Sequence, residues 1–186
     1  IALKDPFLKI DIDWFKTGIT GQSIILFLGG LFLLYKSTKE IRQKVENTNE
    51  DEVLKSPKVI SFSSVIIQII LIDIVFSFDS ILTAVGMTNG IEGALIIMII
   101  AVIVSILIMM IFSKPISNFV NKNPTIQMLA LSFLILIGFM LITEAAHLSH
   151  TEIFNKTVGA IPKGYLYFAI AFSLGVEMLN LKIRKK

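Results

Sequence analysis

Long apolar stretches alternate with short polar segments along this 186-residue chain. Continuous apolarity over roughly 20 residues is typical of a helix that spans a membrane, even where β-branched residues are frequent. The pattern predicts an all-α, polytopic transmembrane helix bundle, in a single domain over residues 1–186. The expected helices cover about residues 21–46, 59–86, 91–112, 125–146 and 164–181.

The first of these helices combines an apolar and a polar part. The apolar part, IILFLGGLFLLY, is short for a span, and the polar sequence KSTKEIRQKVE continues the helical pattern after it. Gly29 and Gly30 would allow a neighbouring helix to approach closely. Residues 4–21 are expected to form a loop whose Trp14 and Phe15 lie at the membrane interface.

The lysine and arginine residues are divided unevenly between the two sides of the expected bundle. If the helices alternate in direction, the polar segment 36–58, a polar turn at 114–124 and the C-terminus share one side, with 12 of the 17. The N-terminal segment and the 147–163 loop share the other side, with 5. Cytoplasmic loops carry the excess of Lys and Arg. We therefore expect a cytoplasmic C-terminus and a bacterial inner membrane.

The composition agrees with a membrane protein and narrows the chemistry. Charged residues make up 17% of the chain, against about 25% in soluble domains, and the mean hydropathy is +0.80. Because there is no cysteine, oxygen or imidazole would have to hold any metal. The net charge of +3 is small, so we expect no nucleic-acid partner. Without a hydrolase, metalloprotease, Walker or Rossmann motif, we expect no enzyme activity and no catalytic residue.

Two carboxylates in one apolar segment, DIVFSFDSILTAVG, are the main candidates for chemistry. Asp73 and Asp79 lie inside the expected helix 59–86, and no Lys or Arg lies within a span to neutralise them. Intramembrane acids usually line a cavity or pathway, because a charge in hydrocarbon costs at least about 2.5 kcal/mol. Six residues at about 100° each place the two on different faces of a regular helix. We expect a bend or break between residues 76 and 83 that turns both carboxylates into the bundle.

Other polar residues would complete such a site. Glu177 is either a ligand or a structural acceptor, and Glu144 is more simply an interfacial acid in contact with water. Gln68 is more simply an interhelical hydrogen-bond donor than a ligand. Four residues with oxygen or amide groups are assigned supporting roles: Ser77, Ser80, Gln68 and Asn180.

His147 and His150 form E-x-x-H-x-x-H with Glu144, which could bind a metal from one helix face. A solvated loop with two unrelated histidines is the more ordinary interpretation. Hard oxygen ligands favour Mn²⁺, Mg²⁺ or Ca²⁺ over copper or zinc. Proton transfer uses the same carboxylates, so the residues alone leave metal transport and proton coupling open.

Three segments together, with the basic tail, resemble the TerC family of integral membrane proteins: DIVFSFDSILTAVG, GGLFLLYKSTKEI and IPKGYLYFAIAFSLGVEMLN. The family is named after tellurium-resistance clusters, and its members are implicated in Mn²⁺ export and metal homeostasis. They typically have seven helices in two related halves, the first with an acidic E-x5-D-N motif. That motif is not found here and the first residue is Ile, so we expect two N-terminal helices to be missing from this sequence.

The resemblance also implies a function. Asp73 and Asp79 match the second-half acids of the family, and Glu144 and Glu177 match recurrent acids of its last two helices. It implies efflux of a divalent cation, foremost Mn²⁺, without a permanently bound cofactor. The expected partners are the lipid bilayer, the metal ion and the missing helices.

Two alternatives remain open. One is a membrane scaffold that assists the metallation or assembly of exported proteins and would bind other membrane proteins. The other is a proton-coupled exporter of a different solute. The 147–163 loop is longer than is usual in the family, so the resemblance gives its histidines no role.

Overall fold

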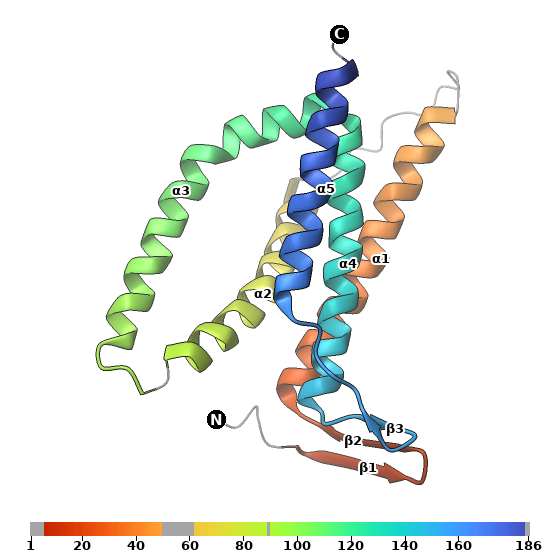
Figure 1. Ribbon diagram of the computed structural model, residues 1–186, viewed down its shortest axis with the longest axis vertical. Coiled ribbons are helices and arrows are strands. Elements are labelled where there is room, and N and C mark those ends of the chain that lie inside the picture. The colour runs from red at the N-terminus through yellow and green to blue at the C-terminus, as the bar shows by residue number, and fades with distance from the viewer. Residues whose placement is uncertain (1–5, 50–61, 89, 185–186) are drawn as a thin grey trace.

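Five helices make up most of the chain, as the sequence pattern predicts (Figure 1). The computed structural model describes residues 6–49, 62–88 and 90–184, without the side chains at 47–49, 64, 79 and 82. The helices are α1 (Gly21–Asn49), α2 (Phe62–Thr88), α3 (Ala94–Lys122), α4 (Pro124–Leu148) and α5 (Lys163–Arg184). By length and hydropathy, α2 to α5 could each cross a membrane. The prediction of an all-α membrane bundle is confirmed, while residues 50–61, which include the expected start of the second helix, lie outside the description.

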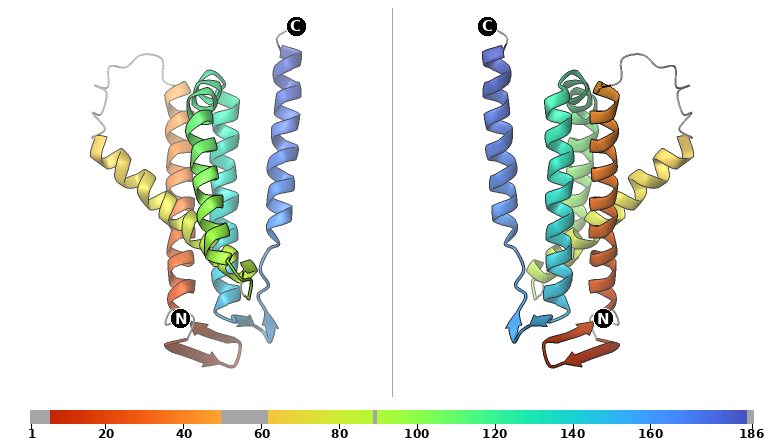
Figure 2. Two further views of the ribbon diagram at one scale, coloured as in Figure 1. Left: turned by 90° about the vertical axis from the view of Figure 1, so that its left-hand side faces the viewer. Right: turned by 90° about the vertical axis from the view of Figure 1, so that its right-hand side faces the viewer.

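The centre of the bundle is the pair α1 and α4, which run side by side (Figures 1 and 2). A Cβ atom on Gly30 would lie 2.6 Å from the carbonyl oxygen of Gly138, so only glycine permits this approach. Gly29 faces α2, where a Cβ would lie 2.6 Å from Cγ1 of Val75. The predicted role of the two adjacent glycines is confirmed. The buried apolar side chains around them are Leu26, Leu33, Val75, Leu141 and Ala145.

A small antiparallel sheet, which the sequence pattern does not predict, covers one end of the bundle. Its strands are β1 (Leu8–Ile12), β2 (Phe15–Ile19), β3 (Glu152–Ile153) and β4 (Lys156–Thr157), in the order β1-β2-β3-β4. Because β2 pairs with β3, the segment before α1 is joined to the loop between α4 and α5. Both expected loops are therefore partly replaced by strands.

The turn between β3 and β4 brings aromatic residues together at this end. Phe154 and Asn155 have φ angles of 52° and 59°, the left-handed conformation that two-residue hairpin turns require. The Phe154 amide donates to the carbonyl of Trp14 at 2.9 Å, and the two rings lie 6.2 Å apart. Trp14 thus lies beside the sheet, at the end of the helices.

α3 is longer than predicted. The expected helix end at residue 112 and the polar turn at 114–124 are wrong, because the helix continues to Lys122 with Pro115 inside it. Proline removes one backbone hydrogen bond and its ring clashes with the preceding turn, which kinks a helix without having to end it. Figure 1 shows the upper part of α3 turning towards α4. A bent helix, rather than a loop, therefore makes most of this connection.

α2 is helical throughout the acidic segment. The break that we expected between residues 76 and 83 is absent, although α2 curves along its length (Figure 1). Asp73 is exposed rather than turned into the bundle, and the side chain of Asp79 lies outside the described residues. The exposure of Asp73 has a rotational cause: α2 contacts α1 through Val75, and position 73 lies about 200° away around the helix.

The ends of the helices alternate as expected. The sheet and the α2–α3 connection lie at one end of the bundle, whereas the α3–α4 junction and the C-terminal end of α5 lie at the other (Figures 1 and 2). α3 and α5 contain no buried residue within the described part of the chain. Their apolar surfaces are therefore open to the bilayer or to further protein.

Candidate functional site

Residues from three helices line one cavity of about 320 Å³ near the sheet end of the bundle. α4 contributes Glu144, one turn before its end, and α5 contributes its first residue, Lys163. α2 contributes Ser80 from the acidic segment. The remaining lining is mostly apolar and consists of Phe76, Ile137, Met140, Leu141, Leu166, Tyr167 and Ile170.

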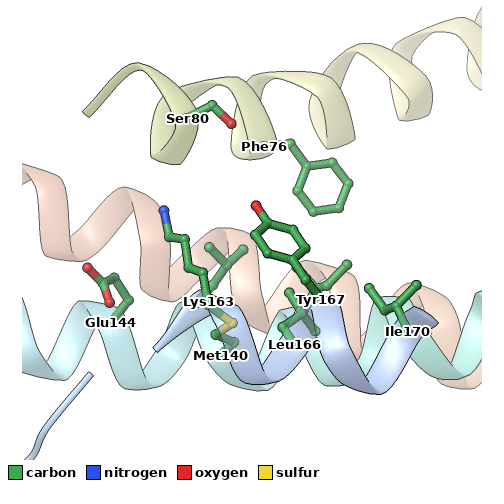
Figure 3. A pocket seen from close by; sticks show the side chains of 10 residues that line it. Phe76, Ser80, Met140, Glu144, Lys163, Leu166, Tyr167 and Ile170 are labelled. Atoms are coloured by element: carbon green, nitrogen blue, oxygen red, sulfur yellow. The ribbon is translucent and has the colours of Figure 1, made fainter. Parts of the chain in front are cut away.

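The packing of α4 against α1 determines where Glu144 points. Leu141 and Ala145, one turn apart, are buried in the core with α1. Glu144 precedes Ala145 by one residue and therefore lies about 100° around the helix from that contact. Its side chain is half-buried and reaches the cavity (Figure 3). The residues alone favour a water-exposed interfacial acid at position 144, whereas in the structure Glu144 lines a partly enclosed cavity.

The face of α2 that lines the cavity lies between the two acidic positions. Ser80 follows position 73 by seven residues, which returns to nearly the same helix face about 10 Å further on. Thr83 follows position 79 by four residues, which again shares a face. Because α2 is unbroken, positions 73 and 79 flank the strip that carries Phe76 and Ser80. Asp73 is therefore on the face that carries Ser80, but it lies about 10 Å from Ser80 along the helix and does not line the cavity.

Lys163 is a polar residue of the cavity that sequence reasoning missed. Its Nζ donates to Oγ1 of Thr83 at 2.7 Å and so connects α5 to α2. Figure 3 shows its ammonium group on the side of the cavity nearest α2, with Glu144 to one side and Tyr167 to the other. Lys163 lies at the boundary between the 147–163 loop and the last expected helix, outside the apolar interior of the spans. The sequence feature that indicates Lys163 is its position directly after Pro162, where the last helix begins.

The other predicted residues lie outside this cavity. Glu177 is half-buried about 21 Å further along α5 from Lys163, and Nδ2 of Asn180 donates to its carboxylate at 3.4 Å. Gln68 and Ser77 are half-buried on α2. Within the described residues, no three His, Asp or Glu side chains are grouped closely enough to hold a metal ion.

The histidines do not join the cavity either. Nδ1 of His147 lies 3.4 Å from the carbonyl oxygen of Val158, in the loop that leads to α5. His150 is exposed and adopts a φ of 47° just beyond α4. The E-x-x-H-x-x-H pattern is therefore divided, with its Glu on the cavity and its second His past the end of the helix.

The cavity combines hard oxygen donors with a cation. One carboxylate and the Ser80 hydroxyl could contribute ligands to a partly hydrated divalent ion, in surroundings whose apolar lining strengthens charge interactions. The Lys163 ammonium would oppose a second positive charge in the same space.

Comparison with known proteins assigns the chain to a family. It matches the model of the integral membrane protein TerC family over residues 12–185. It is 45% identical to the UPF0053 inner membrane protein YgdQ of Escherichia coli over 184 residues. This alignment covers 99% of this chain and 68% of YgdQ.

Two further relatives agree with this assignment. The chain is 42% identical to a UPF0053 protein of Haemophilus influenzae over 171 residues, and this alignment covers 92% of this chain and 65% of that protein. It is 39% identical to the Escherichia coli inner membrane protein YoaE, of which it covers 29%. No solved structure matches it. On these matches, and with four helices among the described residues long and apolar enough to span a bilayer, the chain belongs to the TerC family of integral membrane proteins.

Proposed function

We propose that the protein is a membrane transporter that exports a divalent metal ion, foremost Mn²⁺, from the cytoplasm. The observation that carries this proposal is the half-buried Glu144, which lines a cavity together with Ser80 of the acidic helix. A carboxylate held beside apolar side chains inside a membrane bundle is expensive unless it binds a cation or a proton. The donor types, carboxylate and hydroxyl oxygen, are those that Mn²⁺ accepts.

In this proposal the acids of the chain act along a path rather than as one fixed cluster. Glu144 and Ser80 hold the ion at the cavity, and Asp73 and Asp79, on the same helix as Ser80, bind it at another point of the path. Glu177, further along α5, offers a second position nearer the C-terminal end. A succession of weaker sites favours release of the ion, which a transporter requires.

Replacement of Glu144 tests the proposal. Glu144→Gln keeps the shape of the side chain and removes its charge, so we expect loss of protection against Mn²⁺ in cells that lack their own manganese exporters. The manganese content of those cells should rise to the level of the empty vector. Transport measured in vesicles should fall at least about tenfold, the change that corresponds to about 1.4 kcal/mol of lost interaction.

A matched control is available on the same end of the bundle. Glu92→Gln changes an exposed acid in the short α2–α3 connection, away from the cavity, and should leave protection intact. If the wild-type protein gives no protection and no change in cell manganese, the exporter proposal fails. A wild type that fails here but is needed for the metal content of exported proteins would favour the scaffold alternative.

A further inference from the structure

We propose that the side chain of Lys163 is an internal cation of the cavity, which occupies the place of the metal ion between transport cycles and is displaced when the ion enters. This inference rests on the proposed function, because it specifies how the same cavity releases its ion. It makes Lys163 a residue that sets the affinity and the release rate.

The first argument is the position of the ammonium group. Lys163 is half-buried, lines the cavity with Glu144 and Ser80, and donates to Thr83 across the space between α5 and α2. Thr83 lies one helical turn after position 79 and three residues after Ser80. The ammonium is therefore held against the face of α2 that offers oxygen atoms to an incoming cation (Figure 3).

The second argument comes from the helix that carries the lysine. Lys163 is the first residue of α5, where the helix dipole presents its positive end. A cation is locally disfavoured there, since acids stabilise helix N-termini and bases stabilise C-termini. Oxygen atoms on the cavity side, among them those of Glu144, Ser80 and Thr83, offset this cost. The field of those atoms is the one on which a metal ion would also depend.

Two cations in a cavity of about 320 Å³ repel each other over a distance shorter than the Debye length of about 8 Å. Binding of a divalent ion must therefore weaken the hold on the ammonium, and return of the ammonium must promote release of the ion. Lys163→Met, which keeps most of the length of the side chain without its charge, should bind Mn²⁺ at least about tenfold more tightly and turn over more slowly. Lys163→Arg retains the charge and should bind Mn²⁺ with an affinity near that of the wild type.

Amine labelling tests the contact without relying on transport. Purified protein in nanodiscs is treated with acetic anhydride, and modification of Lys163 is followed by mass spectrometry. Lys9 and Lys156, both exposed on the sheet at the same end, serve as internal references. Thr83→Val removes a hydrogen-bond acceptor of the ammonium, so labelling of Lys163 should rise relative to both references. Unchanged labelling would overturn the α2–α5 contact.

Titration with Mn²⁺ then tests the exchange. In the wild type, Mn²⁺ should increase labelling of Lys163 over the concentration range in which it binds, with Lys9 and Lys156 unaffected. Mn²⁺ binding without any change at Lys163 would refute the exchange and leave the proposed function standing. Absence of Mn²⁺ binding by the wild type would overturn the proposed function and the exchange together, while the Thr83→Val result would still decide whether the contact exists.

Discussion

At the residue scale, the contact between Gly30 and Gly138 sets how closely α1 and α4 pack. A Cβ on Gly138 would lie 3.0 Å from the Gly30 carbonyl oxygen, so each glycine is confined by the backbone of the other. Backbone cannot move aside as a flexible side chain can. Small residues at helix interfaces let membrane helices approach and gain van der Waals contact.

Gly30→Ala should therefore destabilise the bundle. Overpacking of a tight contact costs about 1–3 kcal/mol, which outweighs the gain of about 1 kcal/mol in helix propensity from Gly to Ala. The midpoint of thermal unfolding in detergent should fall. Gly175→Ala is the matched control, because no atom lies within 4 Å of a Cβ built at that position of α5. It should be neutral or slightly stabilising, and equal effects of the two changes would contradict the packing argument.

The residues of the candidate site were only partly predictable. Ser80 and Glu144 could be chosen from the sequence because polar groups in apolar segments require a reason. That Ser80 and Glu144 line the same cavity could not be predicted, because it depends on how α2, α4 and α5 are rotated about their axes. Lys163 was missed since it lies at a helix end, from which a long side chain reaches into the bundle.

At the element scale, apolar length predicted the helices well and their ends less well. The centres of all five helices follow from continuous hydropathy, but α3 extends ten residues past its expected end at 112. Proline is often the end of a helix, whereas α3 continues past Pro115 as a bent helix. The strands were missed because sequences such as LKIDI and FKTGI are short and owe their pairing to the distant segment 152–157.

The bend of α3 is expected to depend on Pro115. Pro115→Ala restores a backbone hydrogen bond and removes the ring clash, so α3 should straighten. Spin labels on cysteines introduced at Ser105 and Asn121, on either side of the bend, should move towards the roughly 24 Å that sixteen residues of straight helix span. The chain has no cysteine of its own, so the labels report these two sites alone.

Pro124 provides the control for this experiment. It is the first residue of α4, where proline fits a helix without cost, so Pro124→Ala should leave the distance unchanged. A distance in Pro115→Ala equal to that of the unsubstituted chain would mean that packing against α4, rather than the proline, bends α3.

At the scale of the whole molecule, the two ends of the bundle differ in charge and in structure. The sheet occupies one end, and the basic C-terminus and the α3–α4 junction lie at the other (Figure 2). The positive-inside rule then predicts a cytoplasmic C-terminus and a sheet on the opposite side of the membrane.

Accessibility of single tags tests this orientation. A tag after Lys186 should react only when the cytoplasmic side is opened to the reagent, and a tag within 154–155, at the tip of the β3–β4 turn, should react in intact cells. A single introduced cysteine with an impermeant maleimide serves for both positions, and the unsubstituted chain gives the background. The reverse pattern would refute the orientation derived from the charges.

The pairing of β2 with β3 has a consequence for biosynthesis. α1 is made before α2 and α3, yet the strand that pairs with the segment before α1, and the helix that covers Gly30, are made after them. At synthesis rates of about 5–20 residues per second, this leaves an interval of several seconds. During that interval the newly made α1 lacks α4, the helix with which it makes most of its described contacts. α1, at the centre of the finished bundle, is thus among the last helices to acquire its native contacts.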